Sequence, residues 1–119
     1  MTKKILVIDD EPDLRLLVRL ILESAGYEIV EAATGEEGLD LMTDERPRLV
    51  LLDIRLPGID GWEVLERMRV DHGGDIPVII MSAHSSPRTL EKAKEHGTQG
   101  YLVKPFKEAE LLRYARQFV

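Results

Sequence analysis

The sequence contains no cysteine, which removes several kinds of chemistry at once. Disulfides, thiolate metal sites and cysteine nucleophiles are all excluded, and the composition fits a reducing compartment. Long apolar runs are also missing, because none approaches the ~20 residues that a membrane-spanning helix needs. The opening Met-Thr-Lys-Lys leads directly into a short strand-like run, unlike a signal peptide. We therefore expect a cytoplasmic protein with no membrane segment.

Basic residues are in the minority. The 119-residue chain has 16 Lys and Arg against 22 Asp and Glu, which gives a formal net charge of −6. Because contacts with a nucleic-acid backbone need clustered Lys and Arg, we expect no direct binding of nucleic acid. With 44% hydrophobic and 32% charged residues, the composition is that of a globular protein. The length suits one domain, and we expect residues 1–119 to form it.

Short apolar runs alternate with helical patterns along the whole chain, and no linker or low-complexity stretch interrupts them. The predicted strands are Lys4–Ile8, Glu28–Ala32, Leu49–Leu52, Pro77–Met81 and Tyr101–Val103. Helices are expected near residues 12–26, 35–46, 60–71, 87–97 and 107–118. Their starts carry the expected signals, namely Pro12, Thr34, Asp60 and Ser86-Pro87.

Apolar residues at steps of three and four define the inward faces of these helices. The first helix is expected to bury Leu14, Leu17, Val18, Ile21, Leu22 and Ala25. The last is expected to bury Leu111, Leu112, Ala115 and Phe118. Strands that read as continuous apolar runs and alternate with helices indicate an α/β fold, a parallel sheet covered on both faces. In such sheets the ligand site lies at the carboxyl ends of the strands.

Chemically complementary side chains follow four of the predicted strands. The acids Asp9 and Asp10 follow the first strand, Asp53 follows the third, Ser82 the fourth and Lys104 the fifth. Carboxylates gathered at one sheet edge repel one another unless their pKa values rise or a cation lies among them. Oxygen ligands without His or Cys suit a hard, partly hydrated ion such as Mg²⁺.

A divalent ion, an ammonium and a hydroxyl together can bind the oxygens of a phosphoryl group. The central Asp53 would then attack phosphorus and become an aspartyl phosphate. Asp10, Asp53 and Asp9 would hold the metal, and Lys104 and Ser82 would hold phosphoryl oxygens. Each residue alone has a simpler explanation. Asp9 and Asp10 could be acids that favour a helix start, and Asp53 could be a turn residue. Ser82 could be an ordinary loop serine, and Lys104 a solvated lysine. Their joint occurrence at four strand ends favours the site.

With these residues in place, the sequence resembles the receiver domains of two-component response regulators over its whole length. The resemblance rests on the acidic pair Asp9-Asp10, on LLDIRLPGIDG around Asp53, on Ser82-Ala83 and on YLVKPF around Lys104. It implies the flavodoxin-like receiver fold, a three-layer α-β-α arrangement around a five-stranded parallel sheet in the order 2-1-3-4-5.

The resemblance also implies roles for the site residues. Asp53 would accept a phosphoryl group from a phosphohistidine on a sensor histidine kinase or a histidine phosphotransfer protein. Mg²⁺ would be required, with Mn²⁺ as a substitute, held by Asp9, Asp10, Asp53 and the backbone carbonyl of Arg55. The peptide bond between Lys104 and Pro105 would be cis, which proline makes accessible.

A switch and its partners are implied as well. Phosphorylation would draw Ser82 toward the phosphoryl group and turn Tyr101 inward, changing the surface of the fourth helix, fifth strand and fifth helix. That surface would control a downstream protein or output domain, and phosphorylation could bring a homodimer. The domain would act on its own Asp53 only and is not expected to be an enzyme. Taken alone, Tyr101 is more simply explained as a packed residue of an edge strand. His84 and Arg55 could border the site, and the simpler explanation for His84 is a solvated loop histidine.

Three other interpretations have specific requirements. A flavodoxin-like FMN carrier needs a phosphate loop rich in hydroxyls and glycine, whereas Asp-Asp-Glu-Pro would repel the FMN phosphate. A haloacid dehalogenase-type phosphatase needs Asp-x-Asp and a cap domain, which Asp9-Asp10-Glu11 and the chain length do not provide. A receiver that takes no phosphate is disfavoured because all acceptor-site residues are present. Two departures from the family pattern, Thr98 after Gly97 and serine in place of threonine at Ser82, leave the proposed ligands intact.

Overall fold

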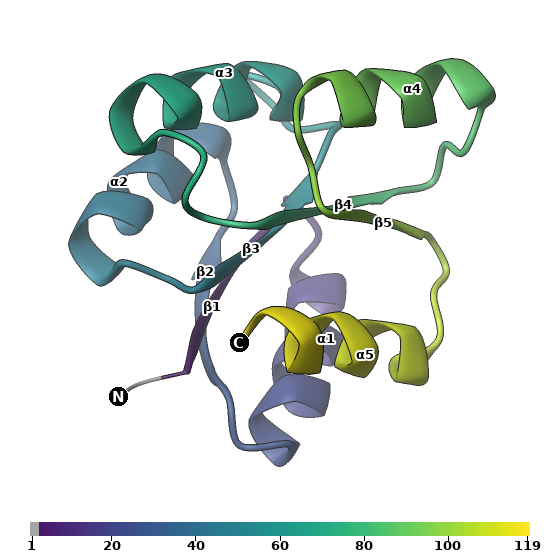
Figure 1. The fold of residues 1–119 in the computed structure, drawn as a ribbon. Helices are drawn as coiled ribbons and strands as arrows, with labels where there is room; N and C mark the ends of the chain where they lie inside the picture. Colours follow the sequence, from purple (N-terminus) through teal and green to yellow (C-terminus); the bar gives the residue numbers. More distant parts are fainter. Residues whose placement is uncertain (1–2) are drawn as a thin grey trace.

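The five predicted strands form one sheet, and a helix follows each of them (Figure 1). The computed structural model describes residues 3–119, so Met1 and Thr2, at the start of the segment in which we expect no signal peptide, lie outside the described residues. The strands are β1 (Lys4–Ile8), β2 (Glu28–Ala32), β3 (Leu49–Asp53), β4 (Val78–Ser82) and β5 (Gly100–Val103). The helices are α1 (Pro12–Ser24), α2 (Gly35–Glu45), α3 (Gly61–His72), α4 (Pro87–Glu95) and α5 (Glu108–Phe118).

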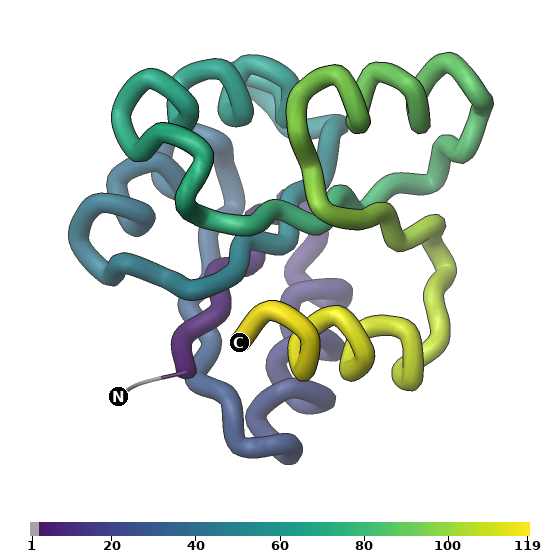
Figure 2. The backbone as a smooth tube through the Cα atoms, in the orientation of Figure 1, coloured from purple at the N-terminus to yellow at the C-terminus, as the bar shows by residue number. Residues whose placement is uncertain are grey.

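All neighbouring strands are parallel, in the order β2-β1-β3-β4-β5. Helices α1 and α5 cover one face of the sheet, and α2, α3 and α4 cover the other. The backbone trace shows the chain crossing from one face to the other between β1 and β3 and again after β5 (Figure 2). The predicted three-layer fold and strand order are confirmed. Among residues 3–119, no helix has the length and apolarity that crossing a bilayer requires.

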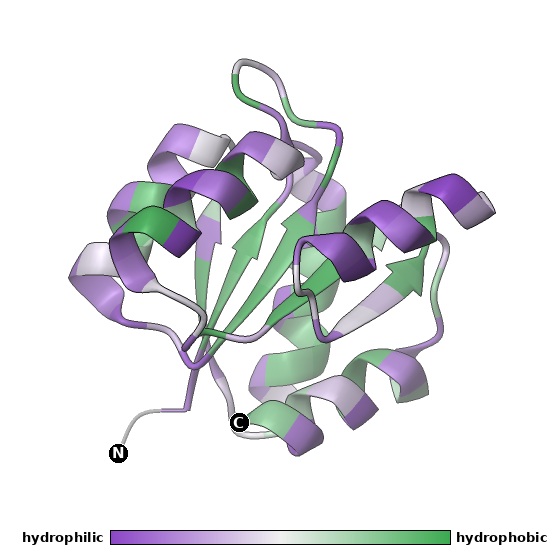
Figure 3. Ribbon diagram, turned by 45° about the horizontal axis from the view of Figure 1, so that its top comes forward, coloured by the Kyte–Doolittle hydropathy of each residue, from purple (hydrophilic) through white to green (hydrophobic). Residues whose placement is uncertain are grey.

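Alternate residues of each strand enter two separate cores, which is why the strands are hydrophobic on both faces (Figure 3). Leu6 and Ile8 of β1 pack beneath α2 and α3, whereas Ile5 and Val7 pack beneath α1 and α5. Every residue of β3 and β4 is buried. A carboxylate at the end of β3 is therefore held at the end of a fully buried strand.

Polar caps fix the starts of the helices that surround the site. The Thr34 hydroxyl accepts a hydrogen bond from the Glu37 backbone N–H at 3.2 Å, and the Asp60 carboxylate accepts one from Glu63 at 3.0 Å. Such caps replace partners that the first turn of a helix lacks. The caps predicted at Thr34 and Asp60 are confirmed.

Some predicted details are wrong. β3 ends at Asp53 and β5 begins at Gly100, so each strand is one residue longer than expected. β4 runs from Val78 to Ser82, one residue later than expected, because Pro77 offers only its carbonyl to the sheet, where it accepts from Val50 N–H at 3.0 Å. Leu17 and Ala25 are exposed, with Leu17 at 49%, because the buried stripe of α1 is centred on Val18 and Leu22. Leu16 and Leu20 are also more than half exposed, at 53% and 57%.

The edge strand β5 is covered by a side chain from α5. The Tyr114 ring lies over Gly100, where a β-carbon would come within 2.4 Å of it. Its hydroxyl oxygen accepts a 3.4 Å hydrogen bond from the Tyr101 backbone N–H. Glycine at this position therefore allows α5 to close against the edge of the sheet.

Candidate functional site

Asp53 ends the central strand β3, and its side chain points to the carboxyl edge of the sheet. Its register partner on β4 is Met81, the preceding Leu52 pairs with Ile8 of β1, and Asp53 is only 5% exposed. One carboxylate oxygen, Oδ1, accepts a 3.1 Å hydrogen bond from the Arg55 backbone N–H. A buried carboxylate with a single backbone donor needs further partners, and the neighbouring strands supply them.

Asp9, the first residue after β1, is completely buried. Its backbone N–H donates to the Ala32 carbonyl at 3.1 Å, which extends the ladder with β2 past the end of the strand. Its Oδ1 atom accepts from the Glu11 backbone N–H at 2.9 Å. The other oxygen, Oδ2, is thereby aimed at the space between β1 and β3, while Asp10 beside it is exposed.

Lys104 joins these two carboxylates. Its Nζ atom lies 2.7 Å from Asp9 Oδ2 and 3.3 Å from Asp53 Oδ2, with a longer 3.4 Å contact to Glu11. The Lys104 backbone N–H donates to the Ser82 carbonyl at 2.8 Å, which holds the end of β5 against β4. The following peptide bond, to Pro105, is cis as predicted. Residues 95 positions apart in the chain thus meet at one point.

Three carboxylates converge beside this ammonium. Each of Asp9, Asp10 and Asp53 offers an oxygen, and these oxygens all lie within 4.8 Å of one another. The ligand set is entirely oxygen, which suits a hard divalent cation that keeps several of its waters. The residues present therefore fit the magnesium site expected from the sequence.

Ser82 and Tyr101 are both connected to the loop between β4 and α4. Ser82 is 2% exposed, and its hydroxyl accepts from the His84 backbone N–H at 3.1 Å. The Tyr101 hydroxyl donates to the carbonyl oxygen of the same His84, and the Tyr101 ring packs against the core under α3 and α4. A single residue of this loop is thus held from both sides, by the hydroxyl beside Asp53 and by the strand β5.

The carboxylates open into a pocket of about 350 Å³ at the carboxyl edge of the sheet. The residues that line it come from all four predicted strand ends: Asp10, Glu11, Asp53, Arg55, Ser82, Ala83, His84 and Lys104. The structure therefore brings together the residues Asp9, Asp10, Asp53, Ser82 and Lys104 that the sequence analysis selected.

The sequence profile of the response regulator receiver domain matches residues 5–116. The chain belongs to this receiver-domain family. Membership implies a phosphoacceptor signalling switch, and members of the family are signalling proteins. The flavin-carrier and phosphatase interpretations are thereby set aside.

Among curated relatives, the receiver domain is 39% identical over 119 residues to sporulation initiation phosphotransferase F of Bacillus subtilis, covering all of this chain and 95% of that protein. It is 38% identical to the DNA-binding dual master transcriptional regulator RpaA of Synechocystis, where 95% of this chain covers 47% of the relative. Receiver sequences of this kind thus occur in relatives of very different length.

A solved structure with the same fold is response regulator TrrA of Thermotoga maritima, crystallised in complex with Mg²⁺ and beryllium fluoride. The two proteins share 36% identity and superpose with a TM-score of 0.87, covering 99% of this receiver domain and 100% of that chain.

Arg15 on α1 is a part of the site that the sequence analysis missed. Its Nη1 atom donates to the Asp9 carbonyl oxygen at 2.6 Å, and its Nε atom lies 3.1 Å from Glu31 Oε1 on β2. The guanidinium therefore ties the end of β1 to α1 and β2. No spacing signals this contact, because one arginine on a helix face is indistinguishable in sequence from a solvated one.

The Asp53 carboxylate has a raised pKa. Burial is the main cause and the neighbouring Asp9 charge adds to it, while Lys104 and the Arg55 N–H act in the opposite direction on the pKa of Asp53. Burial lowers the pKa of Lys104, but its hydrogen bond to Asp9 and the charges of Asp53 and Asp9 outweigh this and raise it overall. The Lys104 ammonium therefore stays charged, and Asp53 is the group whose ionised form is disfavoured.

This raised pKa predicts a stability that depends on pH in the absence of divalent cations. The ionised form of Asp53 is less favourable in the folded than in the unfolded chain, so its cost is absent below the unfolded pKa of 3.8, grows as pH rises from there, and is fully present above the raised folded pKa. Asp53→Asn should raise the melting temperature at pH 7, by about 4 °C for each kcal/mol removed. The difference should shrink toward pH 4.5 in thermal melts followed by circular dichroism, and a gain that is independent of pH would contradict the prediction.

The start of α3 lies directly against the end of β3, and this contact depends on Gly61. A β-carbon there would be 2.6 Å from the Asp53 carbonyl oxygen and 2.7 Å from Ile54 Cα, both backbone atoms that cannot move aside. Gly61→Ala should therefore destabilise the fold by about 1–3 kcal/mol, measured by urea unfolding. Gly74→Ala is the matched control, because nothing lies within 4 Å of a β-carbon there, and equal effects of the two changes would contradict the packing argument.

Proposed function

We propose that this chain is a single receiver domain, residues 1–119, that accepts a phosphoryl group on Asp53 in a Mg²⁺-dependent reaction. The observation that carries the proposal is the contact of one ammonium, Lys104 Nζ, with both buried carboxylates, at 2.7 Å from Asp9 and 3.3 Å from Asp53. A partly buried ammonium shared between carboxylates, next to an exposed third acid, is an arrangement that binds a dianion together with a divalent cation.

The proposed step is the transfer of a phosphoryl group from a phosphohistidine. An oxygen of the Asp53 carboxylate attacks phosphorus, the bond from phosphorus to the imidazole nitrogen breaks, and its electron pair remains on that nitrogen. The Arg55 backbone N–H holds Asp53 Oδ1 at 3.1 Å and fixes the rotation of the carboxylate. Lys104 and the Ser82 hydroxyl lie in the same pocket and would bind the phosphoryl oxygens.

The metal would be held by Asp9, Asp10, Asp53 and the backbone carbonyl of Arg55. When bound, Mg²⁺ would neutralise the clustered carboxylates and the phosphoryl oxygens during transfer. The complex of TrrA with Mg²⁺ and beryllium fluoride supports this assignment by similarity. Mn²⁺ has the same preference for oxygen ligands and is the expected substitute.

The phosphodonor is proposed to be a sensor histidine kinase or a histidine phosphotransfer protein in the cytoplasm. Helix α1 stands beside the mouth of the acceptor pocket and exposes Leu16, Leu17 and Leu20. Leu17 also lines an adjoining hollow of about 350 Å³ with Pro105 and Phe106. An apolar face of the donor would cover these residues while its phosphohistidine reaches Asp53.

The output is proposed to pass from Ser82 through His84 to Tyr101. Since Ser82 and Tyr101 bind the N–H and the carbonyl of the same residue, a shift of the Ser82 hydroxyl toward a phosphoryl group would release one side of this link. The surface of α4, β5 and α5 would then change its affinity for a downstream protein, an output domain or a second copy of the chain. No direct contact with nucleic acid is proposed.

A phosphorylation assay tests the proposal. Incubation with Mg²⁺ and acetyl phosphate or phosphoramidate should add one phosphoryl group, detected by intact-mass spectrometry, and excess EDTA should reduce the rate to the background. Mn²⁺ added in excess over the EDTA should restore the rate of phosphorylation. Failure of every donor to add mass in the presence of Mg²⁺ would identify the chain instead as a receiver that binds partners without taking phosphate.

A further inference from the structure

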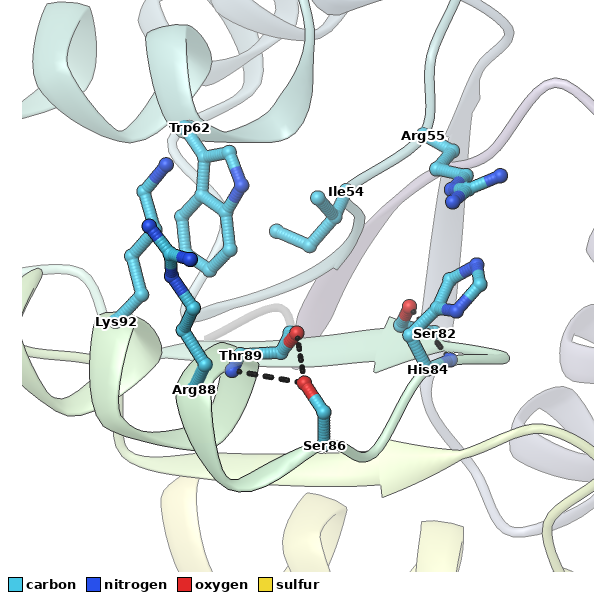
Figure 4. A pocket seen from close by; sticks show the side chains of 9 residues that line it. All are labelled: Ile54, Arg55, Trp62, Ser82, His84, Ser86, Arg88, Thr89 and Lys92. Carbon is cyan, nitrogen blue, oxygen red and sulfur yellow. Dashed lines mark hydrogen bonds between the residues drawn. The ribbon is translucent and has the colours of Figure 1, made fainter.

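A second pocket, of about 320 Å³, adjoins the acceptor site between α3 and α4 (Figure 4). Trp62 stands between Ile54 and Lys92, with the Arg88 guanidinium beside it, and Arg55 and His84 face one another at the opposite end, nearer Ser82. Only this last end borders the proposed phosphoacceptor site. Arg88, Lys92 and Trp62 have no part in it.

The lining of this pocket is basic in a protein that is acidic overall. Arg55, Arg88 and Lys92 carry permanent positive charges, and no Asp or Glu lines the pocket, although the chain has a net charge of −6. Within residues 3–119, the guanidinium groups of Arg55 and Arg88 have no ion pair or hydrogen bond. Glu91 and Glu95 lie with Arg88 and Lys92 on a separate hollow and pair with neither.

The remaining polar groups of the pocket do not compensate these charges. The Ser86 hydroxyl accepts from the Thr89 backbone N–H at 3.2 Å and contacts the Thr89 hydroxyl at 2.8 Å, so both are engaged in capping α4. The start of α4 carries no acidic residue in its first turn. Its partial positive charge therefore adds to that of the side chains instead of being balanced.

Trp62 makes the pocket unsuitable for stacking a nucleotide base. Lys92 Nζ lies 4.7 Å from the ring centroid, in a cation–π contact. The His96 ring lies 5.1 Å from the Trp62 ring at an interplanar angle of 36°. With the indole engaged by a lysine and a histidine, what the pocket offers a ligand is a set of positive charges rather than an aromatic face.

We propose that this pocket binds an acidic segment of a partner protein. It is lined by Trp62, Arg88 and Lys92, with Arg55 and His84 at the end nearer Ser82. Carboxylates spaced along a peptide can reach Arg88, Lys92 and Arg55 in turn, and charge complementarity guides the approach. The site is distinct from the surface of α4, β5 and α5 proposed for output, because it uses the opposite side of α4, which faces α3.

Hexaglutamate is the probe for this site, and the protein reports on it directly because Trp62 is the only tryptophan in the chain. Titration at low ionic strength, without Mg²⁺ or phosphodonor, should give a saturable change in Trp62 fluorescence. The double change Arg88→Glu and Lys92→Gln should weaken binding by about tenfold or more. Glutamate near the start of α4 is favourable for the helix, so this variant should fold. Because Asp53 is not phosphorylated in the assay, the result is independent of the proposed phosphoacceptor function.

The control variant makes the same change of charge away from the pocket, with Arg116→Glu and Lys107→Gln, two exposed residues at α5. It should bind hexaglutamate within about twofold of the unchanged protein. Amide shifts in ¹⁵N-labelled protein should map to residues of the pocket. Three results would overturn the proposal: no saturable binding, equal weakening in both variants, or tighter binding of ATP, phosphate or a single-stranded oligonucleotide than of the peptide at matched ionic strength.

Discussion

Replacing Asp53 with asparagine should abolish phosphorylation, lowering the rate of mass gain with Mg²⁺ and acetyl phosphate by at least about 10³-fold. The amide has nearly the shape of the carboxylate but lacks its negative charge and its nucleophilic oxygen. Asp53 is buried between β1 and β4 and lies against Lys104, so no other side chain can occupy its position. The loss should therefore be complete and should not depend on the phosphodonor.

Asp60→Asn is the matched control, because Asp60 is an exposed aspartate that caps α3 and asparagine preserves that role. It should be phosphorylated at the rate of the unchanged protein. The expected opposite effects of Asp53→Asn, a loss of phosphorylation and a gain in thermal stability at pH 7, distinguish it from a variant that has simply failed to fold. A phosphoryl group found on the Asp53→Asn protein would place the acceptor at Asp9 or Asp10 instead.

Removing the ammonium of Lys104 should separate phosphorylation from its consequence. In Lys104→Ala, Asp53 and the metal ligands remain, so the protein should still gain phosphoryl mass. The connection from the acceptor to β5 should be lost, since Lys104 Nζ touches Asp53 while the Lys104 backbone is bound to Ser82. Amide shifts of Ser82, His84 and Tyr101 on addition of Mg²⁺ and beryllium fluoride should be large in the unchanged protein and mostly absent in the variant.

The same variant leaves two buried carboxylates without their cation, so the metal-free fold should lose about 3 kcal/mol of stability. Lys107→Ala, at an exposed lysine three residues away, should alter neither stability nor the amide shifts. Shifts of unchanged size in Lys104→Ala would show that the link from Ser82 through His84 to Tyr101 responds without the Lys104 ammonium, and the role given to Lys104 would be wrong.

The main part of the candidate site could be predicted because it depends on strand ends. Asp9, Asp53, Ser82 and Lys104 each stand at the carboxyl end of an apolar run, and a parallel sheet brings such ends to one edge whatever the details of packing. The layers of the fold and the caps of the helices could also be predicted, because these features are set by residues close together in the chain.

The contacts that were missed depend on how helices sit on the sheet. Arg15 reaches the Asp9 carbonyl only because α1 crosses β1 and β2 at a particular rotation, which also leaves Leu17 exposed. Periodicity gives the inward face of a helix to within about one residue position, or ~100° of rotation, and Leu17 lies within that margin of Val18. The basic pocket between α3 and α4 is likewise formed by side chains of separate elements, Trp62 and Arg88, that no motif connects.

The closure of β5 by Tyr114 limits how any partner can attach to this protein. The outward N–H of Tyr101 is already occupied by the Tyr114 hydroxyl, and the ring fills the space beside Gly100. An incoming strand would find neither the donor nor the room that pairing with this edge requires. Partners on this side must therefore recognise side chains of α4 and α5, and the sheet is protected there from edge-to-edge aggregation.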